Sequence, residues 1–193
     1  FGVDHGETLL ELIEDLHKIT GIQRIRLGSL EPGIVTDAFA EALSRLPKVC
    51  PHFHLSLQSG CDTVLKRMNR KYDSAEYEEK CKILRKYFEH PAITTDIIVG
   101  FPGETSADVD ETIDVINRVK YDNAFTFIYS KRTGTPAAAM ENQVPEDQVK
   151  KDFDRLLKVV QDTARERVAR LEGQTLEALV EEVNEQDASL LTG

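Results

Sequence analysis

Residues 93–105, ITTDIIVGFPGET, decide the fold. Six of the first seven residues are β-branched, which is typical of a buried strand. The chain then turns at two glycines and a proline in residues 100–103, and a helical pattern follows. A strand that only packs in a core needs neither Asp96 within the run nor Glu104 at its exit. We expect Asp96 to be functional and Glu104 to be a helix-start residue that favours the helix N-terminus electrostatically.

Strand and helix patterns alternate along the rest of the chain. Apolar spacing predicts helices at 7–19, 36–46, 73–88, 104–119 and 145–173, and strands at 22–29, 52–59, 93–100 and 124–130. Helix N-termini are indicated by Thr36 and by two pairs at capping-box spacing, Asp73 with Glu76 and Thr105 with Asp108. Strands joined by crossover helices pair in parallel, and ligands bind at their carboxyl ends. The sequence therefore predicts an α/β fold with a ligand site on the loops after the strands.

Four polar residues fall at or soon after predicted strand ends: Ser29, Gln58, Arg70 and Asp96. Arg binds a carboxylate through two hydrogen bonds, Asp accepts from hydroxyl or ammonium groups, and Gln donates and accepts. Together they suit a zwitterionic, hydroxylated ligand. Each has a plainer alternative. Asp96 would be a structural partner of a neighbouring Arg, and Arg70 would be a solvated residue of a basic turn.

Composition limits the remaining possibilities. A chain of 193 residues with 40% hydrophobic and 30% charged residues suits one globular domain with a small appendage. We expect no membrane span and no signal peptide, and the opening Phe suggests a fragment. The formal net charge of −10 argues against general attraction to nucleic acid, although a local basic patch would still bind it. The three cysteines, at 50, 61 and 81, match no metal motif, so we expect reduced packing residues.

Three longer blocks resemble the radical S-adenosylmethionine enzymes, and specifically their methylthiotransferase branch. They are HLSLQSGCDTVLKRMNRKY (54–72), TTDIIVGFPGET (94–105) and YSKRTGTPA (129–137). The resemblance implies that residues 1–172 form the C-terminal part of a (β/α)6 TIM-like barrel, with about four of its parallel strands. It also implies that residues 173–193 begin a small TRAM-like RNA-binding β domain.

The same resemblance implies roles in binding S-adenosylmethionine. Arg70 would hold the methionine carboxylate, Ser29 the amino-acid moiety, and Gln58 with Asp96 the amino group or ribose. The adenine would lie beside the Val99, Gly100 and Phe101 segment and meet the backbone near Tyr129 and Ser130. The family binds a [4Fe–4S] cluster through C-x-x-x-C-x-x-C, which is absent from this sequence. We therefore expect no metal ligands here, no cluster on this fragment, and no activity from it alone.

Within the methylthiotransferases, RIRLGSLEP (24–32) and HLSLQSG favour the branch that modifies C2 of N6-threonylcarbamoyladenosine beside the tRNA anticodon. The alternatives are the isopentenyladenosine and ribosomal-protein branches, a non-catalytic RNA-binding scaffold, and a phosphate-binding α/β barrel enzyme. The implied partners are the tRNA anticodon stem-loop and a reductant such as flavodoxin or ferredoxin, in the cytoplasm. The candidate RNA-facing residues, whose alternative is a solvated surface, are Lys66, Arg67, Lys71, Lys131 and Arg132.

Overall fold

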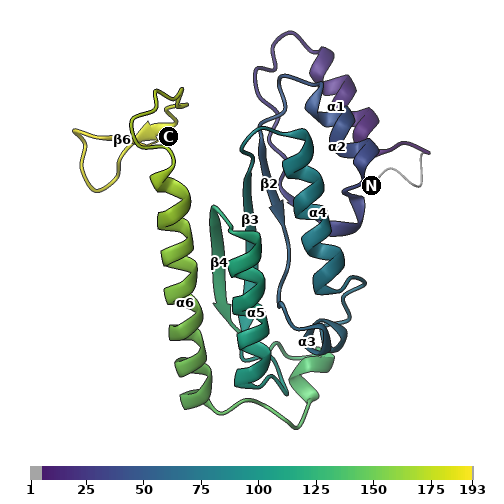
Figure 1. Cartoon of the computed structure of the whole chain (residues 1–193), viewed down its shortest axis with the longest axis vertical. Helices are drawn as coiled ribbons and strands as arrows, with labels where there is room; N and C mark the ends of the chain where they lie inside the picture. The colour runs from purple at the N-terminus through teal and green to yellow at the C-terminus, as the bar shows by residue number, and fades with distance from the viewer. Residues whose placement is uncertain (1–5, 193) are drawn as a thin grey trace.

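The computed structural model describes residues 6–192, and a four-stranded parallel sheet organises them (Figure 1). Its strands lie in the order β1-β2-β3-β4. They span Ser29–Leu30, His52–Leu55, Ala92–Val99 and Asn123–Ile128. Each strand pairs in parallel with the next along the chain. The predicted α/β fold with four parallel strands is confirmed.

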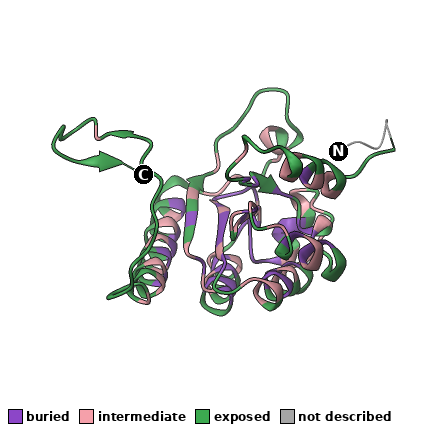
Figure 2. Cartoon of the chain, turned by 90° about the horizontal axis from the view of Figure 1, so that it is seen from above, coloured by how far each residue is buried: buried purple, intermediate pink, exposed green. Residues whose placement is uncertain are grey.

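Helices cover one face of this sheet (Figure 2). The α-helices are α1 (Leu9–Lys18), α2 (Asp37–Ser44), α3 (Asp62–Arg67), α4 (Ser74–Tyr87), α5 (Ser106–Val119) and α6 (Glu146–Ala169). Two 3₁₀ turns, η1 (Pro32–Ile34) and η2 (Pro136–Ala139), follow β1 and β4. Helices α1, α2, α4, α5 and α6 contact one another in that order. The opposite face of the sheet is not covered by these helices, and we call it the free face.

The predicted helix starts are confirmed in atomic detail. The Thr36 side chain accepts from the backbone N–H of Phe39. Full capping boxes join Asp73 with Glu76 and Thr105 with Asp108. These contacts satisfy backbone donors that the first helical turn leaves unpaired, so the start of each crossover helix is specified locally.

Strand β3 divides its side chains between the two faces. Thr95 and Ile97 are fully buried beneath the helices. Thr94, Asp96 and Ile98 point to the other face and line its cavities. Alternation along a strand produces this division. Asp96 therefore lies on the face of the sheet opposite the helices.

The predicted and observed elements differ in two places. The predicted strand 22–29 is reduced to a single bridge between Ile25 and Val49 followed by the two residues of β1. This segment lies at the sheet edge, where the backbone has only β2 as a partner. Helix α3, in turn, was not predicted, because its six residues are too few to show periodicity.

The last residues form a unit of different character. Strands β5 (Glu182–Val183) and β6 (Leu191–Thr192) pair antiparallel. Large apolar side chains in and around these strands are exposed, namely those of Leu176, Leu179, Val180, Val183, Leu190 and Leu191. The predicted boundary near residue 173 and the assignment to an RNA-binding β domain both stay predictions. Within residues 6–192, no helix has the length and apolarity that crossing a membrane requires.

Candidate functional site

The free face of the sheet carries two cavities. The carboxyl-end cavity, of about 840 Å³, is lined by Gln58, Arg67, Arg70, Asp96, Phe101, Tyr129, Ser130 and Arg132, among others. The amino-end cavity, of about 560 Å³, is lined by Arg26, Ser29, His52, His54, Thr94 and Phe125, among others. The first has the size of a small-molecule site and lies where parallel sheets bind ligands.

Arg70 reaches the carboxyl-end cavity from the segment after α3. Its Nη1 lies 3.5 Å from Glu31 Oε1, and the guanidinium is partly exposed. The neighbouring Tyr72 hydroxyl donates to the carbonyls of Ser56 at 2.6 Å and Leu57 at 3.1 Å. Burial raises the pKa of Tyr72 to about 12, so this donor stays protonated. The segment bearing Arg70 is thereby fastened to the end of β2.

Gln58 has an unusual backbone. Its φ of 72° lies in the left-handed region, which non-glycine residues rarely adopt. Its N–H donates to Asp96 O at 2.8 Å, and its carbonyl accepts from Ile98 N at 2.9 Å. These two bonds hold the strained residue against β3 and direct it to the cavity that also contains Asp96. Strain of this kind is common at ligand sites.

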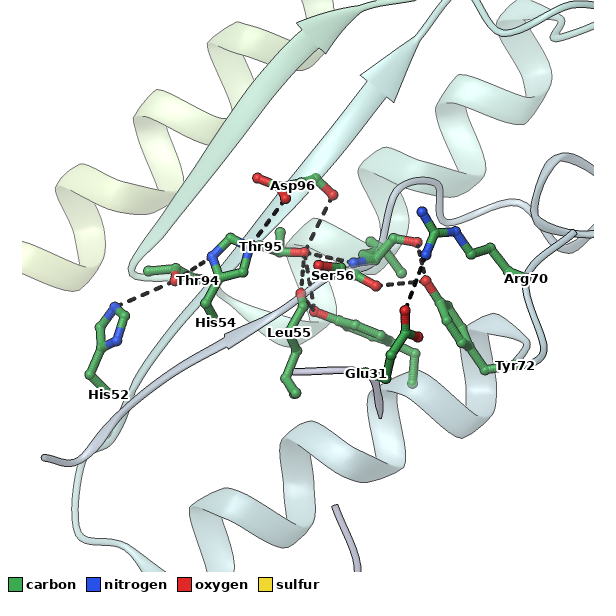
Figure 3. A network of polar contacts seen from close by, with 12 residues as sticks. Glu31, His52, His54, Leu55, Ser56, Arg70, Tyr72, Thr94, Thr95 and Asp96 are labelled. Atoms are coloured by element: carbon green, nitrogen blue, oxygen red, sulfur yellow. Dashed lines mark hydrogen bonds and ion pairs between the residues drawn. The ribbon is translucent and has the colours of Figure 1, made fainter. Parts of the chain in front are cut away.

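Asp96 pairs with a histidine, and not with the arginine considered from sequence. Its Oδ2 lies 3.2 Å from His54 Nε2. His54 Nδ1 lies 3.0 Å from the Thr94 hydroxyl, which lies 3.5 Å from His52 Nε2. Figure 3 shows these side chains following one another along the sheet toward Asp96. Asp96 thus meets the cavity with one oxygen held by the protein.

The apolar wall of the carboxyl-end cavity comes from the loop after β3 and the end of β4. The rings of Phe101 and Tyr129 meet edge to face, with centroids 5.3 Å apart. Tyr129 N donates to Val99 O at 2.8 Å. Val99 itself is buried, whereas Phe101, Tyr129 and Ser130 line the cavity. Gly100 has a φ of 83°, and a Cβ there would lie 2.8 Å from Val149 Cγ2, so the turn packs tightly on α6.

Glu104 is not the helix-start residue that we expected. It precedes the N-cap Thr105 and is 7% exposed. Its Oε2 accepts from Gly100 N at 2.5 Å, so it braces the loop over residues 100–104 from inside. Burial raises the pKa of Glu104 to about 7, against an ordinary value of 4.5. The acid in the first turn of α5 is Asp108.

This burial predicts an unusual pH dependence. A carboxyl group whose folded-state pKa is raised binds its proton more tightly in the folded state. The stability that Glu104 contributes through this proton is therefore fully present below about pH 4.5 and is lost as the pH rises through 7. Glu104→Gln keeps the acceptor for Gly100 N and removes the charge. We expect urea denaturation to show a wild-type loss of about 3 kcal/mol between acid and alkaline pH that the Gln variant lacks. If the wild type and Glu104→Gln lose stability equally with pH, the prediction is wrong. Glu104→Ala, which also removes the acceptor for Gly100 N, should be less stable than the wild type at every pH.

Ser29 is separated from the other predicted ligand-binding residues. It pairs with His54 in the register of β1 and β2 and lines the amino-end cavity. Gln58, Arg70 and Asp96 share the carboxyl-end cavity without it. Its predicted contact with the amino-acid moiety therefore lacks the support that the other three share.

Two of the five candidate RNA-facing residues lie at the carboxyl-end cavity. Arg67 and Arg132 line it, and Arg67 lies 3.8 Å from Asp108. Lys66, Lys71 and Lys131 are exposed. The cavity thus has a basic rim on a chain whose total charge is acidic.

The cysteines do not fit a [4Fe–4S] cluster. Within residues 6–192, all three are free, and Cys61 and Cys81 are buried in separate hydrophobic clusters. The one group of potential metal-binding side chains in the described part holds Cys61 with Asp108 and Glu111, a single thiol. Burial raises the pKa of both buried thiols, to about 12 for Cys81. A [4Fe–4S] cluster is held by several thiolates that lie close together, and these three cysteines do not provide such a set.

A comparison with family models gives the decisive match, because residues 2–116 match the model described as the Radical SAM superfamily. The chain belongs to that superfamily. Among its relatives are proteins named tRNA-2-methylthio-N(6)-dimethylallyladenosine synthase. The one from Lachnoclostridium phytofermentans is 42% identical over 191 residues, which are 99% of this chain and 42% of that protein. The one from Acetivibrio thermocellus is 43% identical over 99% of this chain and 40% of that protein.

These names confirm the predicted resemblance to radical SAM methylthiotransferases. The chain spans about two fifths of the length of these relatives. Solved structures support the fold at low identity. Coproporphyrinogen III oxidase (HemN) from Escherichia coli has a TM-score of 0.65 at 14% identity, over 80% of this chain and 36% of that one. The radical S-adenosylmethionine methyltransferase TsrM from Kitasatospora setae has a TM-score of 0.56 at 17% identity, over 71% and 27%. A partial radical SAM barrel is therefore confirmed.

Sequence reasoning missed three residues of this radical SAM chain: His52, His54 and Thr94. Both histidines lie in HFHL, where alternation places them on one face of β2. Two histidines on one face of a strand next to the strand of Asp96 are a signal from which a polar partner for Asp96 could have been predicted.

Proposed function

We propose that this chain supplies most of the S-adenosylmethionine cradle of a tRNA methylthiotransferase that modifies N6-dimethylallyladenosine. The observation that carries the proposal is the gathering of Gln58, Arg70 and Asp96 in one cavity at the carboxyl ends of the strands, in a chain of the radical SAM superfamily. A carboxylate, a guanidinium and an amide match the charged and hydroxyl groups of this ligand.

Each side of the cavity has a distinct part in binding. Arg70 takes the methionine carboxylate, which replaces the weak, exposed ion pair with Glu31. Asp96 accepts from the ribose or the ammonium group, and Gln58 adds a second polar contact. Phe101 and Tyr129 offer an apolar wall to the adenine and keep water from it. When bound, S-adenosylmethionine supplies the radical chemistry from which the superfamily takes its name, and this chain orients it.

The branch within the methylthiotransferases differs from our first expectation. The sequence blocks favoured threonylcarbamoyladenosine, but the similar relatives are named as dimethylallyladenosine synthases. That isopentenyladenosine branch was our alternative, and the relatives support it better. The first expectation rested partly on the short motif HLSLQSG, which is weaker evidence than 42% identity over 191 residues.

The wider partners are part of the proposal. The phosphates of a tRNA anticodon stem-loop would meet the five candidate RNA-facing residues, Lys66, Arg67, Lys71, Lys131 and Arg132. A reductant such as flavodoxin or ferredoxin, [4Fe–4S] clusters held outside this segment, and a cytoplasmic location complete it. Residues 173–193 would begin the RNA-binding β domain.

Calorimetry with S-adenosylmethionine tests the cradle. We expect the 193-residue chain to bind it, and Arg70→Ala to weaken binding by about 1.5–2 kcal/mol, roughly tenfold to thirtyfold. The loss is limited because the guanidinium is partly exposed. Glu31→Gln is the matched control, since it frees Arg70 and should leave affinity equal or slightly higher. No binding by the wild type, or an unchanged affinity in Arg70→Ala, would contradict the proposal.

A further inference from the structure

Five side chains form a continuous line along the free face of the sheet. Arg26 Nε lies 3.4 Å from His52 Nδ1, and His52 Nε2 lies 3.5 Å from Thr94 Oγ1. Thr94 Oγ1 lies 3.0 Å from His54 Nδ1, and His54 Nε2 lies 3.2 Å from Asp96 Oδ2. The line begins in the amino-end cavity and ends in the carboxyl-end cavity. Figure 3 shows its course from His52 to Asp96.

When both rings are neutral, the two ends fix the direction of every hydrogen bond between them. A guanidinium only donates, so His52 Nδ1 must accept and the proton of His52 lies on Nε2. Thr94 Oγ1 then accepts from His52 and gives its own proton to His54 Nδ1. The proton of His54 therefore lies on Nε2, where it meets an ionised carboxylate that only accepts. For two neutral rings, a single assignment of protons satisfies all four contacts.

We propose that Arg26, His52, Thr94 and His54 form a relay of one polarity, with both histidines as neutral Nε2–H tautomers, which positions the Asp96 carboxylate for the ligand. Asp96 Oδ2 is held by His54, so Oδ1 remains for one donor in the carboxyl-end cavity. His54 and Thr94 are positioning residues, because they act on the ligand through Asp96. The identity of the ligand rests on the proposed function, whereas the relay itself does not.

The surroundings of the histidines fit neutral rings. His54 is flanked by Ser29 from β1, by Thr94 and Asp96 from β3, and by the Phe125 ring from β4 at a centroid distance of 6.0 Å. Burial, with the positive charge of Arg26 and the nearby His54, lowers the pKa of His52. Asp122 acts on His52 in the opposite sense. Its carboxylate, however, is already bonded to Arg167, Arg170 and the N–H of Ile93.

The relay also explains why Thr94 is a threonine. Its side chain is nearly buried on a face where Val would pack equally well, and the two residues have similar shape. Only a hydroxyl can accept from one ring and donate to the next. Thr94→Val removes that link with little change of volume, and Thr94→Ser restores it. The pair isolates the hydroxyl from packing.

Nitrogen-15 NMR of the imidazole rings tests the relay without any ligand. At neutral pH we expect both His52 and His54 to show a protonated Nε2 and an unprotonated Nδ1. Thr94→Val should shift the His54 Nδ1 resonance, and Thr94→Ser should return it toward the wild-type position. A proton on Nδ1 of either ring, a doubly protonated ring, or unchanged resonances in Thr94→Val would overturn the relay.

Calorimetry with S-adenosylmethionine then tests positioning. Thr94→Val and His54→Ala should each lower affinity severalfold, with recovery in Thr94→Ser. Full affinity in both variants would show that the relay does not position Asp96, and the proposal would fail. If the wild type shows the expected tautomers but does not bind S-adenosylmethionine, the proposed function fails and the relay stands, so the two failures are distinguishable.

Discussion

Replacing Gly60 with Ala should destabilise the fold by about 3 kcal/mol, the upper end for forcing an extra methyl group into a packed site. Gly60 lies between the end of β2 and α3, with its backbone against α5. A Cβ there would lie 2.5 Å from Thr112 Cα and 2.9 Å from Val115 Cγ2. The first contact is with backbone, so α5 would have to move. Such a movement would also stretch the 2.9 Å bond from Gly60 N to Thr112 Oγ1.

Urea denaturation at fixed pH measures this effect, and Gly33→Ala is the matched control. A Cβ on Gly33 meets no atom within 4 Å, so its replacement should change stability by less than about 1 kcal/mol. A Gly60→Ala variant as stable as the wild type would show that α5 does not press on this segment. Because α5 follows the 100–104 loop, loss of its position would also disturb the site.

The sheet and most helices were predictable from local chemistry. The β-branched run before Gly100 and the capping pairs at Asp73 and Thr105 act within a few residues, so each is legible in one stretch of sequence. The segment before β1 behaved differently. Its sequence has the alternation of a strand, but a strand also needs hydrogen-bonding partners. At the sheet edge this backbone is paired on one side only.

The site was predictable only in part, because its decisive contacts join separate elements. Gln58, Arg70 and Asp96 could be placed at strand ends, and the cavity brings them together. Glu104 illustrates the limit: its sequence position suggested a helix-start residue, whereas tertiary packing buries it and its carboxylate accepts from Gly100 N. The partner of Asp96 was equally hidden. His54 is 42 residues away, and only the register of β2 with β3 brings them together.

Asp96→Asn should cause the largest loss of ligand affinity, about 2–3 kcal/mol or roughly thirtyfold to 150-fold for S-adenosylmethionine. The substitution is nearly isosteric, so the sheet should be unaffected. Its amide has one acceptor and one donor, where the carboxylate has two acceptors. His54 Nε2–H needs an acceptor, and the amide oxygen will therefore face His54.

The amide NH₂ group must then point to the carboxyl-end cavity, where the ligand also offers a donor. Two donors facing each other replace a charge-assisted hydrogen bond, which is why the loss should exceed that of Arg70→Ala. Asp96→Glu is a useful comparison, because it keeps the charge and misplaces it by one methylene. Calorimetry gives the affinities, and denaturation should show Asp96→Asn within about 1 kcal/mol of the wild type. If Asp96→Asn binds as tightly as the wild type, Asp96 is a structural partner of His54 alone, and the ligand must reach the protein elsewhere in the cavity.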